Sequence, residues 1–138
     1  METILNTSAS GLGHGLLIFF AGLFSFSSAR VIAQDKNHVV RLARLQIDPA
    51  QLEQYRSILK EEIEASIRIE PGVLTLYAVA EKNNPSHITI LEIYASTEAY
   101  KSHLETPHFK KYKNAAKDMV KSLDLAEADP IVLGTKTK

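Results

Sequence analysis

Residues 73–94 read VLTLYAVAEKNNPSHITILEIY, and this stretch decides the fold. Its two ends are rich in β-branched and aromatic residues, and the six residues between them carry strong turn chemistry. The stretch therefore predicts a hairpin of two strands, 73–80 and 87–94. Strict alternation places Glu92 on one face with Ile88, Ile90 and Tyr94, and it places Leu74 and Leu76 on the face opposite Tyr77.

A strand and a helix precede the hairpin. Residues 38–47 are rich in Val, Leu and Ile and predict a strand. Asp48-Pro49 follows with an N-cap and a first-turn proline, and Pro71-Gly72 ends the helix. Between them, apolar side chains recur at helical spacing, so one stripe should face a core; its members are Leu52, Tyr55, Leu59, Ile63 and Ser66 or Ile67.

Two helices and a last strand are predicted after the hairpin. Ser96 caps a short helix that runs to about Leu104, and Thr106-Pro107 starts another. The second helix shows a buried stripe that consists of Phe109, Tyr112, Ala116, Met119 and Leu123. Residues 131–133, after Asp129-Pro130, predict the final strand. The order is βαββαβ, which indicates an α+β class, ferredoxin-like split βαβ fold with an antiparallel sheet.

The predicted helices cover only one face of the sheet. The other face carries Val, Ile and Leu side chains, and an exposed apolar face of that size favours association. Twofold pairing is the commonest solution. We therefore expect a homodimer that packs sheet face against sheet face.

The amino-acid composition limits the number of domains, the kinds of partner and the kinds of site that we expect. The chain has 138 residues, 45% of them hydrophobic, which suits one domain, expected at residues 34–138. Sixteen basic and sixteen acidic side chains give no net charge, so nucleic acid is not an expected partner. The absence of cysteine excludes disulfides, thiolate catalysis and zinc–cysteine sites.

The first 33 residues resemble a signal peptide. The apolar run from Leu16 to Phe26 is too short to span a bilayer comfortably, and Val31-Ile32-Ala33 resembles a cleavage site before Gln34. Residues 1–15 contain neither Lys nor Arg, which departs from the usual pattern. We expect export to the periplasm or the medium; the alternatives are an uncleaved membrane anchor and a cytosolic extension.

Three segments resemble the antibiotic biosynthesis monooxygenase family. They are Glu70-Pro71-Gly72-Val73, the segment 91–96 (LEIYAS) with Glu98-Ala99, and residues 103–109 (HLETPHF), which resemble the H-x-x-T-P-H-F signature of the quinol monooxygenase branch. The resemblance covers about residues 38–134. It implies a dimeric α/β-barrel with a pocket between sheet and helices, and oxygenation of dihydroxyaromatic compounds without metal or flavin. Haem-degrading relatives have Trp where this chain has Tyr94, which disfavours haem as the substrate.

Two histidines are the candidate catalytic residues. A phenolate donates electrons to oxygen far better than a phenol, so a base with a pKa near 7 suits cofactor-free oxygenation. His103 is expected on the inward side of the short helix as the proton acceptor. His108, beside Phe109, is expected as a secondary binding group. The alternatives are a core histidine bonded to a carbonyl and a simple helix-start residue.

Other residues are candidates for substrate binding. Tyr94, Tyr77 and Phe109 can line a pocket for an aromatic ring, although ordinary packing explains them equally well. Glu92 needs a partner if it is buried, either Arg41 or Arg44 or a pocket histidine. Arg44 can attract an anionic substrate or form an ion pair. No metal site is predicted, because no carboxylate stands near the histidines at ligand spacing.

The leading hypothesis is a cofactor-independent monooxygenase that acts on a small quinol or phenol with dioxygen. An isomerase, or another proton-transfer enzyme acting on a small carbonyl compound, could use the same base. A non-catalytic dimer that binds small molecules remains the third hypothesis.

Overall fold

The computed structural model describes residues 30–31 and 37–135. Its strands are β1 (Arg30–Val31), β2 (Val39–Ile47), β3 (Val73–Ala80), β4 (His87–Tyr94), β5 (Val120–Ala128) and β6 (Gly134–Thr135). Its helices are α1 (Leu52–Ile69), α2 (Thr97–Glu105) and α3 (Pro107–Ala116), and a 3-10 turn, Pro49–Gln51, leads into α1. The predicted signal peptide, with its cleavage site, lies outside the described residues apart from Arg30 and Val31.

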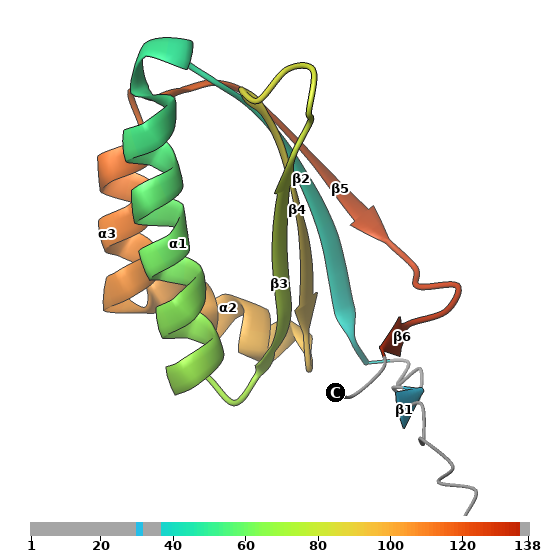
Figure 1. Cartoon of the computed structure of the whole chain (residues 1–138). Coiled ribbons are helices and arrows are strands. Elements are labelled where there is room, and N and C mark those ends of the chain that lie inside the picture. Colours follow the sequence, from blue (N-terminus) through green and yellow to red (C-terminus); the bar gives the residue numbers. More distant parts are fainter. Residues whose placement is uncertain (1–29, 32–36, 136–138) are drawn as a thin grey trace, which may run out of the picture.

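The main sheet is antiparallel and has the strand order β3-β4-β2-β5. All three helices lie on one side of it, and α1 and α3 run alongside each other (Figure 1). This arrangement confirms the predicted α+β, ferredoxin-like βαββαβ fold. In the described part of the chain, no helix is long and apolar enough to cross a membrane.

Side-chain caps begin the helices as the sequence predicts. Each capping oxygen accepts a hydrogen bond from a backbone N–H that has no partner within the helix. The three pairs are Asp48 with Ala50 N at 3.0 Å, Ser96 with Ala99 N at 3.2 Å, and Thr106 with Phe109 N at 3.3 Å.

The turn between α1 and β3 presses against α2. A Cβ atom on Gly72 would lie 2.5 Å from the Cβ of Ala99, which is closer than two non-bonded carbon atoms can approach. The Gly72 carbonyl also accepts a hydrogen bond from Ala95 N at 2.9 Å. Glycine at this position therefore lets α2 pack directly on the beginning of the sheet.

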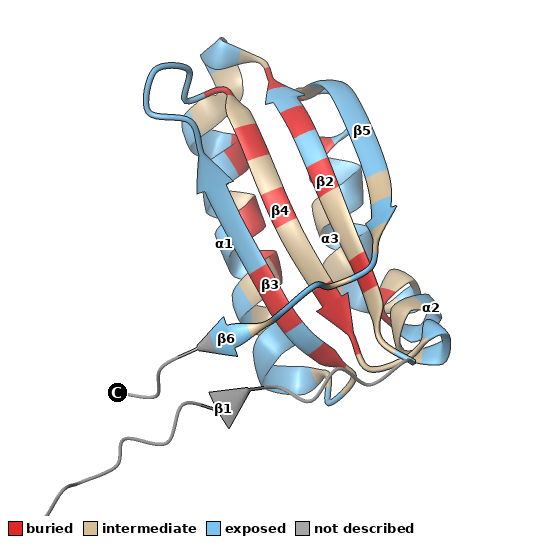
Figure 2. Ribbon diagram, turned by 90° about the vertical axis from the view of Figure 1, so that its right-hand side faces the viewer, coloured by how far each residue is buried: buried red, intermediate tan, exposed pale blue. Residues whose placement is uncertain are grey.

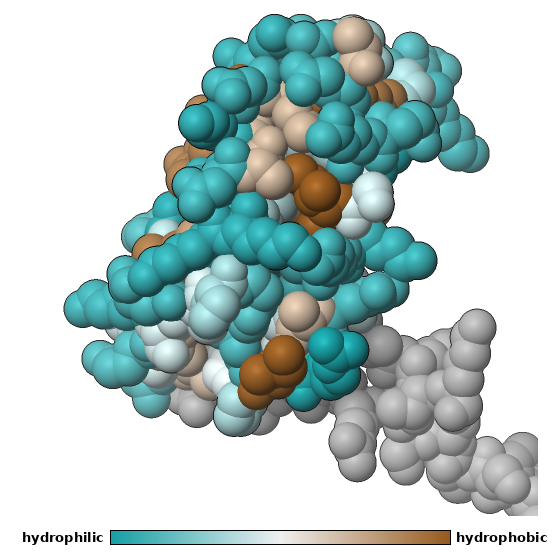
Figure 3. All heavy atoms as spheres, turned by 90° about the vertical axis from the view of Figure 1, so that its left-hand side faces the viewer, coloured by the Kyte–Doolittle hydropathy of each residue, from teal (hydrophilic) through white to brown (hydrophobic). Residues whose placement is uncertain are grey.

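Cross-strand rows show which side chains share a face. The row Leu76–Glu92–Arg41–Glu127 faces the helices, and the next row, Tyr77–Leu91–Leu42–Ala126, faces away from them. The two central strands carry most of the buried residues of the sheet, and the edge strands are largely exposed (Figure 2). The helices turn a mostly hydrophilic surface outward (Figure 3).

The predicted alternation in 73–80 is wrong at its beginning. Val73 and Leu76 are both buried in one cluster, whereas Leu74 is exposed. The register shifts between Val73 and Thr75, where a β-bulge inserts an extra residue. A bulge of this kind moves the following side chains to the opposite face.

The predicted final strand is also wrong. It was expected at residues 131–133, but the fourth strand of the main sheet is β5, and α3 ends at Ala116. Met119 and Leu123 therefore do not continue the helical stripe. Met119 N bonds to Ala116 O at 2.9 Å in a turn, and Leu123 lies opposite Leu45 in the sheet. Leu123 and Leu125 also alternate with polar residues, so the same segment fits the pattern of a strand as well as that of a helix. Pairing with β2 decides in favour of the strand.

Candidate active site

A cavity of about 480 Å³ lies between the sheet and the helices. Aromatic rings form much of its wall, and we call it the ring-lined cavity; the rings belong to Tyr94, Tyr100, His103, Phe109 and Tyr112. Carboxylates of Glu62 and Glu92 and the guanidinium of Arg41 also border it. Its size and its mixture of rings with a few polar groups are typical of a small-molecule site.

His103 lies on the wall of this cavity, as the sequence predicts. The residue is only 2% exposed, and its ring centroid lies 4.6 Å from that of Phe109 and 5.3 Å from that of Tyr94. Helix α2 positions it, because Ser96 caps the helix and His103 lies in its last turn. A buried imidazole among rings is well placed to meet an aromatic ligand.

Glu70, which was not predicted as a site residue, contacts both candidate histidines. Its Oε1 lies 3.0 Å from His103 Nδ1 and 2.5 Å from His108 Nε2. A carboxylate only accepts hydrogen bonds, so both ring nitrogens donate to this oxygen. Burial alone would raise the pKa of Glu70, but the hydrogen bonds from His108 and His103 lower it below its usual value.

Glu62 lies on the other side of His103. Its Oε1 is 3.7 Å from His103 Nε2 and accepts a hydrogen bond from Ser66 Oγ at 2.8 Å. Burial raises the pKa of Glu62, although the hydrogen bond from Ser66 and the nearby His103 oppose this. The signal for both glutamates is visible in the sequence, because positions 55, 59, 62, 66 and 70 continue one helical stripe.

Glu92 and Tyr94 form a buried pair in the ring-lined cavity. The Tyr94 hydroxyl donates to Glu92 Oε2 at 3.1 Å. Burial raises the pKa of Glu92, against the effects of this hydrogen bond and of Arg41. Burial and the neighbouring Glu92 also raise the pKa of Tyr94, so its hydroxyl stays protonated.

Arg41 lines the ring-lined cavity, whereas Arg44 does not. Arg41 lies directly opposite Glu92 in the sheet, and its guanidinium carbon lies 4.6 Å from the centre of the Tyr100 ring. Arg44 points to the other face, where it forms an ion pair with Asp124 at 3.0 Å. Of the two partners proposed for Glu92, the structure places Arg41 beside it.

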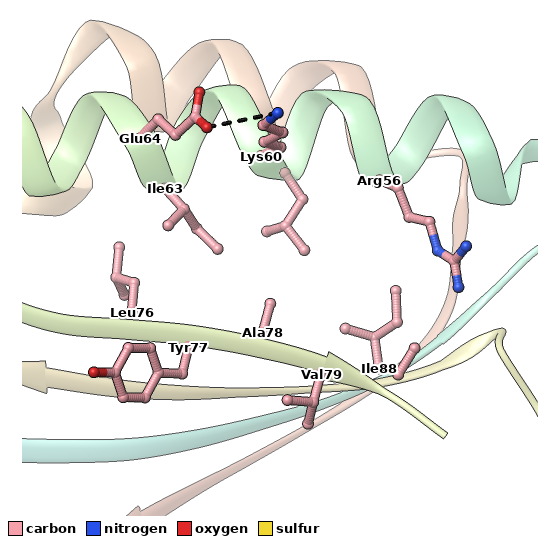
Figure 4. Close-up of a pocket in the computed structure, with 11 residues that line it drawn as sticks. Arg56, Lys60, Ile63, Glu64, Leu76, Tyr77, Ala78, Val79 and Ile88 are labelled. Atoms are coloured by element: carbon pink, nitrogen blue, oxygen red, sulfur yellow. Dashed lines mark ion pairs between the residues drawn. The ribbon is translucent and has the colours of Figure 1, made fainter. Parts of the chain in front are cut away.

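Tyr77 also lies outside the ring-lined cavity. It is 60% exposed, and it points away from α1 together with Val79, whereas Leu76 and Ala78 point toward α1 (Figure 4). A second hollow of about 590 Å³ lies between α1 and the edge strand β3. Leu59, Ile63 and Leu76 line both this hollow and the ring-lined cavity.

His108 does not line the ring-lined cavity either. It borders a hollow of about 30 Å³ together with Glu62, Lys111 and Tyr112.

Glu70, His103 and His108 have donor atoms that all lie within 4.8 Å of one another, and we call these three residues the three-donor cluster. These are residue types that bind zinc. The prediction of no metal site assumed that no carboxylate stands near the histidines, and that assumption is wrong because Glu70 reaches them from the end of α1.

The sequence pattern of the antibiotic biosynthesis monooxygenase family matches residues 38–115. The chain belongs to this family. A crystal structure of a protein assigned to the family from Bacteroides thetaiotaomicron VPI-5482 is 61% identical, with a TM-score of 0.71, covering 75% of this chain and 98% of that one.

More distant solved structures share the fold. A protein assigned as a monooxygenase from Lactobacillus acidophilus NCFM is 29% identical, with a TM-score of 0.66, covering 77% of this chain and 49% of that one. A protein from Caulobacter crescentus CB15 is 23% identical, with a TM-score of 0.65, covering 69% of this chain and 91% of that one, and it shows the fold alone. No curated protein sequence matches the chain.

Proposed function

We propose that this family member oxygenates a small quinol or phenol in the ring-lined cavity, with dioxygen as the oxidant and without a cofactor. The observation that carries the proposal is the buried His103 imidazole on the wall of a cavity lined by aromatic rings. The names of the related structures support a monooxygenase, and the phenolic substrate is our inference from the cavity.

The hydrogen bond to Glu70 sets the tautomer of His103. Because Nδ1 donates its proton to Glu70, the neutral ring has its lone pair on Nε2. Nε2 can then accept a proton from a phenolic hydroxyl, and the imidazolium that forms stays hydrogen-bonded to the Glu70 carboxylate. The same arrangement of carboxylate, imidazole and substrate hydroxyl orients the base in other proton-transfer enzymes.

The reaction balances without an external reductant. The deprotonated quinol gives its electrons to dioxygen, one oxygen atom enters a ring carbon–hydrogen bond as a hydroxyl group, and the other oxygen atom leaves as water. The two hydrogen atoms of that water come from the two quinol hydroxyl groups, so a benzoquinol and dioxygen give a hydroxybenzoquinone and water. The residues supply a site that binds the ring, excludes water and removes the first proton.

Oxygen uptake with a panel of hydroquinones tests the proposal. Replacement of His103 by Gln should lower the rate by about 10²–10⁴-fold, the usual contribution of a general base. His87→Gln is the matched control, because His87 is an exposed histidine that contacts Glu81 and Asn84, away from the cavity. No uptake by the wild type with any quinol would contradict oxygenation, and turnover of a carbonyl compound without oxygen would favour a proton-transfer enzyme.

We also propose that the protein acts as a homodimer joined through the face of the sheet opposite the helices. On this face Tyr77 is 60% and Val79 is 63% exposed, and they adjoin the apolar Leu91 and Leu42 across the strands. Light scattering should give the mass of two chains, and Leu42→Glu should shift it toward one chain. A monomeric wild type at micromolar concentration would contradict the proposal.

A further inference from the structure

We propose that Glu70, His103 and His108 form a binding site for one divalent transition-metal ion, with zinc as the best-suited ion. The three residues come from the end of α1, the last turn of α2 and the first turn of α3. Their ligand atoms already converge, since Nδ1 of His103 and Nε2 of His108 both point at one oxygen of Glu70. The proposal concerns binding by the resting protein and does not depend on the proposed reaction.

Two of the three distances between donor atoms fit a metal after a small adjustment, and the third, between the two ring nitrogens, is at most 4.8 Å. Zinc bonds of about 2.0–2.1 Å in a tetrahedral site place neighbouring donors roughly 3.3–3.4 Å apart. The two nitrogen-to-oxygen distances are 3.0 Å for His103 and 2.5 Å for His108. Each therefore has to widen by less than about 1 Å. The side chain of His108 is 17% exposed, which makes it the ligand with the most freedom to move.

The surroundings of the cluster resemble those of a metal site. A metal-bound histidine usually directs its other ring nitrogen at a carboxylate, which orients the ring and strengthens the ligand. His103 comes close to this arrangement, because its Nε2 lies 3.7 Å from Glu62 Oε1, and Ser66 holds that carboxylate. A divalent ion would also compensate the buried carboxylate of Glu62 and the partly buried carboxylate of Glu70.

The donor set indicates which ions would bind. Two imidazole nitrogens and one carboxylate oxygen favour zinc and other late transition metals over magnesium and calcium, which prefer all-oxygen sites. Three protein ligands leave a coordination position for water. The hollow of about 30 Å³ beside His108 and Glu62 has room for a water molecule at this end of the cluster.

The metal site and the proposed base share one imidazole. A metal on Nδ1 of His103 displaces the proton from that nitrogen, so the neutral ring carries its proton on Nε2 instead. Nε2 then donates toward Glu62 and cannot accept a proton from a substrate. If the proposed function holds, the metal-bound protein is therefore the inhibited form, and this consequence alone depends on that function.

Calorimetric titration of the metal-free full chain with Zn²⁺ tests the site. We expect one ion per chain, with binding weakened at least 10-fold by His108→Gln and by Glu70→Gln, and about 10–100-fold by Glu62→Gln, which removes the supporting carboxylate. His87→Gln is the control and should bind as the wild type does. Circular dichroism of each variant checks that it is folded, and His108→Gln, at the most exposed ligand, keeps the test valid if Glu70→Gln does not fold.

The outcomes separate this proposal from the proposed function. Absence of zinc binding by the wild type, or full binding by folded His108→Gln, overturns the metal site and leaves oxygen uptake by the metal-free protein as it was. Stoichiometric binding, together with no oxygen uptake by the metal-free protein, supports the metal site and contradicts the oxygenase. A visible spectrum of the Co²⁺-loaded wild type that is lost in His108→Gln supports coordination by this imidazole.

Discussion

The two faces of the main sheet use similar residue types in different surroundings. Toward the helices, Arg41 and Glu92 lie next to each other beside a cavity, and burial raises the pKa of Glu92. On the other face, Arg44 pairs with an exposed Asp124, and Tyr77 extends from the edge strand. The difference shows that position relative to the helices, rather than residue type, separates residues of the candidate site from residues of the surface.

The same contrast applies to the histidines. His103 is buried and contacts two carboxylates through its two ring nitrogens. His87 lies on the outer face at the start of β4, and its ring nitrogen is 3.4 Å from an exposed Glu81. Charge pairing is weak in water and strong where water is excluded, so the carboxylates orient the ring of His103 more firmly than Glu81 orients that of His87.

The largest expected difference between the two faces is in the stability effects of substitutions at adjacent residues of β4. Ile90 belongs to the buried core on the helix side, whereas Thr89 lies on the outer face. Ile90→Ala should lower the free energy of unfolding by about 2–5 kcal/mol, because it leaves a cavity. With both substitutions made in the Leu42→Glu background, which is expected to be monomeric, Thr89→Ala should change it by about 0.5 kcal/mol or less. Urea denaturation measures both, and equal effects would mean that the helix layer does not cover β4.

The contact between α2 and the sheet provides the second test. Gly72→Ala should destabilise the fold by about 1–3 kcal/mol, since its new methyl group overlaps the Cβ of Ala99. Ala99→Gly in the same chain removes the overlap and should recover part of the loss. A double-mutant cycle measures this coupling. Additive effects of the two substitutions would show that the contact is looser than 2.5 Å implies.

Most of the fold was predictable from local signals. The caps at Asp48, Ser96 and Thr106 each mark a helix start, because short polar side chains satisfy free N–H groups there. The final strand was not predictable in this way, because Ala116, Met119 and Leu123 also satisfy helical spacing. Pairing of β5 with β2, which joins residues 73 to 88 positions apart in the sequence, decides between the two interpretations.

The candidate site was predictable only in part. The inward position of His103 follows from the cap of a short helix and its spacing, and the structure agrees. Glu70 was missed because it lies 33 residues from His103 in the sequence and meets it only in the folded chain, at the point where α1 ends. Alternation alone could not distinguish Arg41 from Arg44, since it separates two faces without saying which one the helices cover.

The pH dependence of stability distinguishes the charges of one cross-strand row. The folded chain holds the Glu92 proton more tightly than the unfolded chain does, because burial raises its pKa. The free energy of unfolding should therefore fall as pH rises from the unfolded pKa, about 4.3, toward the higher folded value. Glu92→Gln has no proton to lose at this position. The free energy of unfolding of the variant, relative to that of the wild type, should therefore increase as pH rises. Glu127→Gln, exposed in the same row, is the control and should show no such gain.

The smallest effect on stability is expected for the Arg44–Asp124 ion pair, although its atoms lie closer together than those of the Arg41–Glu127 pair. Arg44 and Asp124 are 3.0 Å apart but largely exposed, so a double-mutant cycle should give about 0.2–1 kcal/mol, decreasing with added salt. The nearest atoms of Arg41 and Glu127 are 3.9 Å apart, yet the Arg41 side chain is only 13% exposed, stacks on Tyr100 and lies opposite Glu92 beside the ring-lined cavity. Arg41→Gln should therefore destabilise the protein more than Arg44→Gln does, and its effect should depend less on salt. The reverse order in urea denaturation would mean that water reaches the ring-lined cavity as freely as it reaches the outer face.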